Sequence, residues 1–118
     1  MIGRSSTALE IAAAVRSGAV SAVDVTQAAL SRIGTDDPRL GAFTAVTADR
    51  ALSEAAKIDA VVAGGGEPGP LAGVPFAVKN LFDVAGLPTF AGSKINAGHP
   101  PAAHDAVLIQ RLTQAGAV

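Results

Sequence analysis

A single lysine, Lys79, stands inside an otherwise apolar run, residues 71–86, with the sequence LAGVPFAVKNLFDVAG. Free lysine is a poor base at neutral pH because its pKa is about 10.4 and the amine stays protonated. Apolar surroundings disfavour the charged form and lower that pKa, so a lysine at the end of a buried strand can serve as a general base. The alternative, which the spacing alone favours, is a stem packed along the sheet with its charged head in water.

Other polar residues downstream carry weaker signals. His99 and His104 lie in a Pro-rich loop with no third ligand and no H-E-x-x-H helix, which indicates solvated histidines and no metal site. Ser93 and Lys94 are neighbours, and neighbouring side chains point apart in an extended chain, so we expect Ser93 to shape the loop near the lysine. Asp83 is predicted to be a turn residue that bonds its own backbone.

Composition narrows the class of protein. The chain has 118 residues, 49% of them hydrophobic, and a formal net charge of −1, so we expect one domain and no nucleic-acid partner. It has no cysteine, which excludes a disulfide framework and is compatible with the cytoplasmic location that we expect. The sequence has no apolar run of membrane-spanning length, so we expect no membrane contact.

The apolar content consists mostly of alanine and valine, with four phenylalanines and no tyrosine or tryptophan. Small domains bury a modest fraction of their surface, so this much apolar surface suggests a piece of a larger core. An Ala-rich composition of genomic origin is the simpler explanation. The final residues, Ala117 and Val118, look like the start of a strand.

Hydrophobic periodicity and capping residues predict four helices. They cover about residues 7–17, 22–33, 48–63 and 105–115. Thr7 and Glu10 form a T-x-x-E capping box, and Ser21, Thr47 and Asp105 are the other predicted N-caps. Glycines at 18, 34 and 116 are predicted to end three of these helices.

Three strands are predicted between the helices, at about 42–46, 74–79 and 87–90. The glycine-rich segment GGGEPGP at 64–70 matches neither phosphate-binding motif and is predicted to be a surface loop. Residues 91–104 form a long Gly/Pro loop, a kind that is often functional. This order predicts an α/β fold in which helices are layered on a sheet.

The segment GPLAGVPFAVKNLFDVAGLPTFAGSK, 69–94, resembles the lysine segment of the amidase signature family. The resemblance extends, less specifically, to the stretches LEIAAAVRSGAVSAVDVTQAALSRI, LGAFTAV and HDAVLIQRLTQAGAV. Within the family, GVPFAVKNLF, AGSKIN and PPAAHDA look closest to the AtzE-like 1-carboxybiuret hydrolase branch. The branch formed by the A subunit of glutamyl-tRNA amidotransferase is a near relative.

This resemblance implies a Ser–cis-Ser–Lys triad that hydrolyses a small amide or urea-type C–N bond without metal or cofactor. Lys79 would be the base that takes a proton from the bridging serine, which activates the nucleophilic serine. The resemblance implies a fold in which helices pack on a mixed central sheet, with residues 1–118 as one incomplete N-terminal segment of a single domain. It also implies a small-molecule amide substrate and leaves room for a small protein partner. Asn80 stands where many members carry aspartate, a difference that does not by itself remove the base.

The two serines of the family belong to a downstream Gly/Ser-rich segment, whereas Ser93 is the sole serine after Lys79 here. We therefore expect an N-terminal fragment that carries the catalytic lysine and is inactive alone. Two other hypotheses stay open. One is a truncated, non-catalytic chain that survives by association with a partner. The other is a small α/β interaction module whose ligand site is the loop 91–104.

Overall fold

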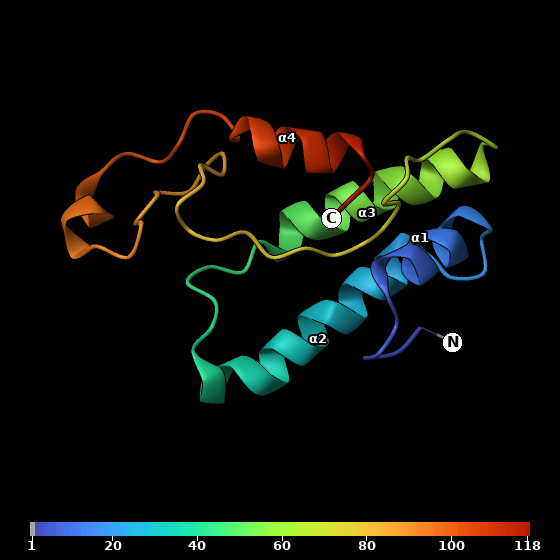
Figure 1. The fold of residues 1–118 in the computed structure, drawn as a ribbon, viewed down its shortest axis with the longest axis horizontal. Helices are drawn as coiled ribbons and strands as arrows, with labels where there is room; N and C mark the ends of the chain where they lie inside the picture. Colours follow the sequence, from blue (N-terminus) through green and yellow to red (C-terminus); the bar gives the residue numbers. More distant parts are fainter. Residues whose placement is uncertain (1) are drawn as a thin grey trace. The chain divides into compact units, whose positions relative to one another are not determined.

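All regular secondary structure is helical within residues 2–118, the part of the chain that the computed structural model describes (Figure 1). The elements are α1 Ala8–Arg16, α2 Ala22–Leu40, α3 Ala48–Ala63, the 3-10 helix η1 Lys94–Gly98 and α4 Val107–Gln114. Backbone contacts divide the chain into two compact units. The helical unit comprises the chain up to Phe76 with Ala115–Val118, and the loop unit comprises Ala77–Gln114.

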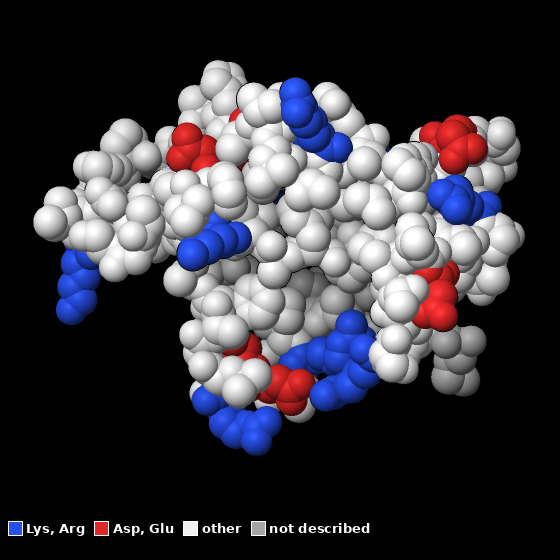
Figure 2. Space-filling view, in the orientation of Figure 1, with Lys and Arg blue, Asp and Glu red and all other residues white. Residues whose placement is uncertain are grey.

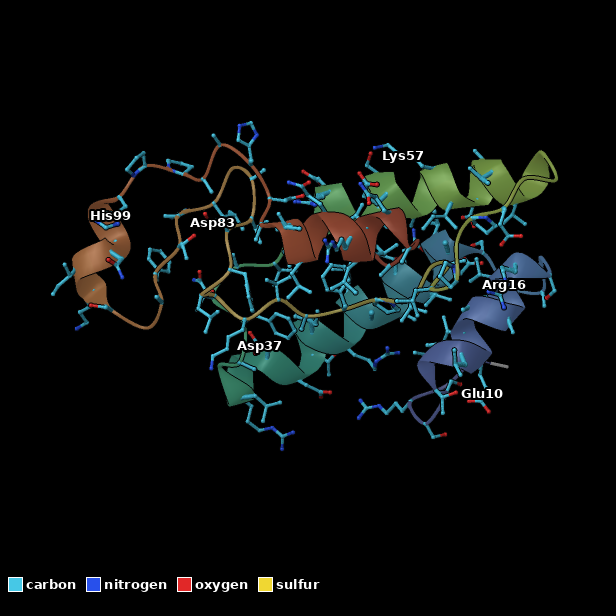
Figure 3. The ribbon with its side chains drawn as sticks, turned by 45° about the horizontal axis from the view of Figure 1, so that its top comes forward. Glu10, Arg16, Asp37, Lys57, Asp83 and His99 are labelled. Atoms are coloured by element: carbon cyan, nitrogen blue, oxygen red, sulfur yellow. The ribbon has the colours of Figure 1, made fainter. Side chains whose placement is uncertain are left out.

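Helix α1 begins at the capping box that the sequence contains. The Thr7 hydroxyl accepts a hydrogen bond from the Glu10 N–H at 3.3 Å, and the Glu10 carboxylate accepts one from the Thr7 N–H at 2.7 Å. That backbone hydrogen bond, followed by a second from the Thr7 hydroxyl, holds the pKa of the Glu10 carboxyl below its ordinary value. Figure 3 labels Glu10 at this end of the helix.

Helix α2 runs seven residues beyond the end predicted at 33, because Gly34 does not stop it. Its last turns contain Pro38, and the Thr35 hydroxyl donates to the Ser31 carbonyl at 3.0 Å. The helix ends at Gly41, whose φ of 63° is left-handed and whose N–H donates to the Asp37 carbonyl at 2.7 Å. A glycine stops a helix where it adopts this conformation, and Gly34 does not.

The start of α2 is capped from another helix. The Ser21 hydroxyl accepts from the Asp24 N–H at 2.9 Å. The carboxylate of Asp59, on α3, accepts from the N–H groups of Ala22 and Val23 at 2.6 and 3.1 Å. Three N–H groups at the start of a helix, which have no partner within the helix, are thereby satisfied. Asp59 also places a negative charge at the positive end of the helix dipole.

Removal of this carboxylate is expected to weaken the helical unit. Asp59→Ala should lower the free energy of unfolding by about 1–2 kcal/mol, the cost of losing a helix N-cap. Asp59→Asn, which keeps a carbonyl oxygen, should lose less. Urea denaturation followed by circular dichroism measures both. Glu67→Ala removes an acid from an exposed loop and serves as the control; an equal effect of Asp59→Ala and Glu67→Ala would contradict the capping role.

The core of the helical unit is built from small residues. Its buried members are Val15, Ala22, Val25, Ala55, Ile58 and Ala72. They come from α1, α2, α3 and the segment after the glycine-rich loop, and α2 packs along α3. Thr26 is 2% exposed, and its hydroxyl has no hydrogen-bond partner within residues 2–118. The small side chains of Ala22 on α2 and Ala55 on α3 let these two helices approach closely.

The strands predicted at 42–46, 74–79 and 87–90 are not formed within residues 2–118, so the predicted mixed sheet is not seen there. A strand needs a neighbouring chain whose N–H and C=O groups complete its ladder. Residues 42–46 are exposed and irregular. Extended segments can be predicted from an apolar sequence, whereas their pairing into a sheet depends on partner segments.

One backbone pairing of the parallel kind does occur. The Val118 N–H donates to the Val74 carbonyl, and the Phe76 N–H donates to the Val118 carbonyl, both at 2.8 Å. This alternation, in which one residue bonds to both neighbours of the residue opposite, is typical of parallel strands. Residues 74–76 and Val118 therefore lie side by side in extended conformation, without reaching the length of a strand.

Candidate active site around Lys79

Lys79 lies on irregular chain at the start of a tight turn in the loop unit. Its carbonyl oxygen accepts hydrogen bonds from the N–H groups of Leu81 and Phe82, at 2.8 and 3.1 Å. The residue is exposed, in contrast to the buried strand end considered from the sequence. Apolar neighbours in sequence did not bury this lysine, because burial requires chain segments packed on both sides.

The next residue, Asn80, holds a distant part of the loop unit. Its side-chain carbonyl oxygen accepts from the Phe90 N–H at 3.2 Å, and its backbone carbonyl accepts from the Ala91 N–H at 2.8 Å. Ala91 has a φ of 47°, the left-handed region that alanine rarely adopts. The segment after Lys79 and the segment 90–91 are therefore joined by two adjacent hydrogen bonds.

Ser93 stands in the same loop and has a local structural role. Its hydroxyl accepts from the Ile95 N–H at 3.3 Å at the start of η1, and its N–H donates to the Phe90 carbonyl at 2.9 Å. The Asn96 side-chain amide donates to the same carbonyl at 2.8 Å. Within residues 2–118, no hydrogen bond joins Ser93 to Lys79. Lys94 is exposed.

The long loop predicted at 91–104 contains η1 and is tied to residues 83–87. The Gly86 N–H donates to the Ala102 carbonyl at 2.9 Å, and the Ala102 N–H donates to the Leu87 carbonyl at 3.0 Å. The Ala85 N–H donates to the Asp105 carboxylate at 2.9 Å. Asp105 was predicted to cap the last helix; its carboxylate instead tethers this loop, and α4 begins two residues later.

The hydrogen bonds of Asp83 also differ from the predicted bond to its own backbone. Its carboxylate accepts from the Thr89 hydroxyl at 2.5 Å, and its backbone carbonyl accepts from the Ala106 N–H at 2.8 Å. Figure 3 labels Asp83 and His99 in this unit. His99 and His104 are exposed, and residues 2–118 contain no group of three or more His, Cys, Asp or Glu side chains that could hold a metal ion.

A hollow of about 350 Å³ lies in the helical unit, and its lining offers no evident chemistry. Its lining residues are Arg4, Arg32, Ile33, Asp36, Asp37, Leu40, Ala42 and Phe43. Both acids are engaged: Asp36 pairs with Arg4 at 3.1 Å, and the Asp37 carboxylate accepts the N–H groups of Ala42 and Phe43. On the face drawn in Figure 2, Lys and Arg side chains lie among Asp and Glu side chains.

The sequence singled out Lys79 but not the residues that organise its surroundings. The hydrogen-bond partners of Asn80, Asn96 and Asp105 were found only from the structure, because these partners lie six to twenty positions away. The signal available in the sequence was the type of these side chains, because asparagine and aspartate often form hydrogen bonds with the backbone of turns and loops. None of the helices in the described part of the chain is long and apolar enough to cross a membrane.

Comparison with known proteins gives one consistent result. A family described as Amidase matches residues 24–118, a range that includes Lys79. The AtzE component of 1-carboxybiuret hydrolase from Pseudomonas sp. (strain ADP) is 54% identical over 110 residues, covering 93% of this chain and 24% of that protein. The A subunit of the glutamyl-tRNA(Gln) amidotransferase from Acidothermus cellulolyticus is 47% identical, covering 95% and 22%.

Two solved structures share the fold of the chain. One, described as an unexpected vestigial protein complex that reveals the evolutionary origins of an s-triazine catabolic enzyme, has a TM-score of 0.94 and 52% identity, covering 96% of this chain and 25% of that one. The other, native peptide amidase from Stenotrophomonas maltophilia, has a TM-score of 0.86 and 36% identity, covering 98% and 24%. The chain thus spans about a quarter of the length of these relatives.

Proposed function

The chain belongs to the amidase signature family, and from this premise we propose that it is the N-terminal part of a longer amidohydrolase, below called the full-length enzyme. The full-length enzyme would cleave the C–N bond of a small amide or urea-type substrate. The match of residues 24–118 to the amidase family, which includes Lys79, is the observation that carries this proposal.

In the proposed reaction, Lys79 accepts the proton of a bridging serine, which in turn accepts the proton of a nucleophilic serine. The nucleophilic oxygen attacks the carbonyl carbon of the substrate, and backbone N–H groups stabilise the resulting oxyanion. The C–N bond breaks, the leaving nitrogen takes a proton and departs as ammonia or an amine, and water hydrolyses the acyl-enzyme. Both serines would come from chain outside these 118 residues.

The exposure of Lys79 is consistent with a base in this chain that acts on serines from another part of the full-length enzyme. A base in an amidase must reach the hydroxyl that it deprotonates, at a distance of about 2.6–3.2 Å. In this chain Lys79 is exposed, so a segment that carries the serines can approach its side chain. The segment that carries the serines would pack over it in the full-length enzyme, and the isolated chain would be inactive.

The branch within the family is the second part of the proposal. The 54% identity to a 1-carboxybiuret hydrolase component favours a small carboxylated urea or amide as substrate. A glutamine amidase of the amidotransferase kind is the second candidate, supported by several relatives that are 46–47% identical. Both relatives are subunits by name, so a small protein partner is also proposed, as is a cytoplasmic location.

Two measurements test the proposal: labelling with a serine-directed fluorophosphonate, and release of ammonia from two candidate substrates. We expect stoichiometric labelling of the full-length enzyme and no labelling of the isolated 118-residue chain. The full-length enzyme should release ammonia from a small carboxylated urea faster than from glutamine; the reverse preference would favour the second candidate. Stoichiometric labelling of the isolated chain would overturn its assignment as an inactive fragment. No ammonia from either substrate would overturn the proposed hydrolase.

A further inference from the structure

We propose that Asn80 is a positioning residue that clamps the segment 90–96 against the turn that carries Lys79. This inference rests on the proposed function, in which Lys79 is the base. It is carried by the paired hydrogen bonds of Asn80 and by the backbone conformation of Ala91, neither of which the family resemblance supplies.

The clamp uses both carbonyl groups of one residue. The side-chain oxygen of Asn80 takes the N–H of Phe90 at 3.2 Å, and the backbone oxygen takes the N–H of Ala91 at 2.8 Å. Two adjacent N–H groups held by one residue fix the orientation of the segment as well as its distance. Asn80 is half-buried, so water competes less well for these bonds than at an open loop.

The clamped segment is itself ordered from the other side. The carbonyl oxygen of Phe90 accepts from the Ser93 N–H at 2.9 Å and from the Asn96 side-chain amide at 2.8 Å. Between these bonds, Ala91 and Gly92 both have left-handed φ values, of 47° and 72°. Alanine in this conformation is strained, and such strain persists only where surrounding contacts over-determine the backbone.

The clamp acts directly on the position of Lys79. The Lys79 carbonyl closes the turn with Leu81 and Phe82, and Asn80 is the first residue inside that turn. If Asn80 loses its hold on Phe90, the turn gains freedom and the lysine amine moves with it. A displacement of about 1 Å in a catalytic group can reduce the rate by about a hundredfold, so the effect should appear in turnover.

Two substitutions in the full-length enzyme test the clamp. Asn80→Ala removes the side-chain acceptor and should lower kcat by ten- to a hundredfold with KM within twofold of the parent. Asn80→Asp keeps an oxygen at the same position and should restore kcat to within about fivefold of the parent. In the 118-residue chain, amide exchange at Phe90 should quicken at least tenfold in Asn80→Ala and remain near the parent rate in Asn80→Asp.

The opposite results overturn the inference. If Asn80→Ala keeps kcat within twofold while Phe90 exchange quickens, the clamp exists but does not position the base. If Phe90 exchange is unchanged, the clamp itself is absent. Should Asn80→Ala fail to fold, Asn96→Ala, which removes only the bond to the Phe90 carbonyl, takes its place: a three- to tenfold loss of kcat at constant KM supports the inference, and an unchanged kcat overturns it.

These outcomes are distinct from failure of the proposed function. If the parent enzyme hydrolyses no C–N bond, the hydrolase assignment falls, and the positioning role falls with it. If the parent is active and loses activity on substitution of Lys79, but Asn80→Ala retains full kcat, the hydrolase assignment stands and only the positioning role is overturned.

Discussion

Lys79→Met in the full-length enzyme is expected to reduce kcat by at least about a hundredfold, because a positioned general base contributes roughly 10²- to 10⁴-fold. Methionine keeps an unbranched side chain of similar length and removes the amine, so packing is retained while proton transfer is lost. The measurement is ammonia release at saturating substrate. KM should change little, since the lysine acts on the bridging serine and does not bind the substrate.

Lys57→Met is the matched control. Lys57, which Figure 3 labels, is an exposed lysine on α3. Its amine pairs with the Glu54 carboxylate at 2.9 Å. Such surface pairs contribute about 0–1 kcal/mol to stability, so this variant should keep the parent kcat. If Lys79→Met retained activity within a few-fold while folding normally, Lys79 would be a structural residue and the proposed triad would be wrong.

Gly116→Ala should strongly destabilise the helical unit. Gly116 is buried with a φ of 92°, and a Cβ there would collide with the carbonyl oxygen of Pro68 and lie 3.1 Å from the Cα of Ala72. Left-handed backbone costs an L-residue about 1–2 kcal/mol. Overpacking against backbone that cannot rotate away adds about 1–3 kcal/mol. Urea denaturation should therefore show a loss of about 2–5 kcal/mol.

Gly18→Ala separates the two contributions. Gly18 has a similar left-handed φ of 74°, and a Cβ there would meet nothing within 4 Å. It should lose only the conformational part, about 1–2 kcal/mol. Equal losses in the two variants would mean that the close approach of Gly116 to Pro68 and Ala72 has no energetic weight. A loss below that of Gly18→Ala would contradict the collision altogether.

The helix starts illustrate what neighbouring residues can predict. Thr7 and Glu10 lie three positions apart, so their capping box forms within one turn and is visible in the sequence. The N-cap at Ser21 is likewise local. The contribution of Asp59 to the start of α2 is invisible in the sequence, because it comes from a different helix, 37 positions away from Ala22.

The helix C-termini and the strands illustrate what neighbouring residues cannot predict. Gly34 and Gly41 look alike as helix terminators, and only the fold places Gly41 in the left-handed conformation with its N–H on Asp37. The segment 74–79 has the composition of a strand, yet within residues 2–118 its only ladder-like partner is Val118. Composition predicts an extended chain, whereas a sheet requires a second chain to receive its hydrogen bonds.

At the candidate site, the sequence by itself predicted which residue could do chemistry. The amine of Lys79 in an apolar run, together with the resemblance of that segment to one family, led to the proposal of Lys79 as the base of an amidohydrolase. The tertiary structure alone decided that Lys79 is exposed in this chain, that Asn80 holds Phe90 and Ala91, and that Asp105 tethers Ala85. The physical reason is range: the chemical identity of a side chain is written at one position, whereas its burial and hydrogen-bond partners are set by segments that meet only when the chain folds.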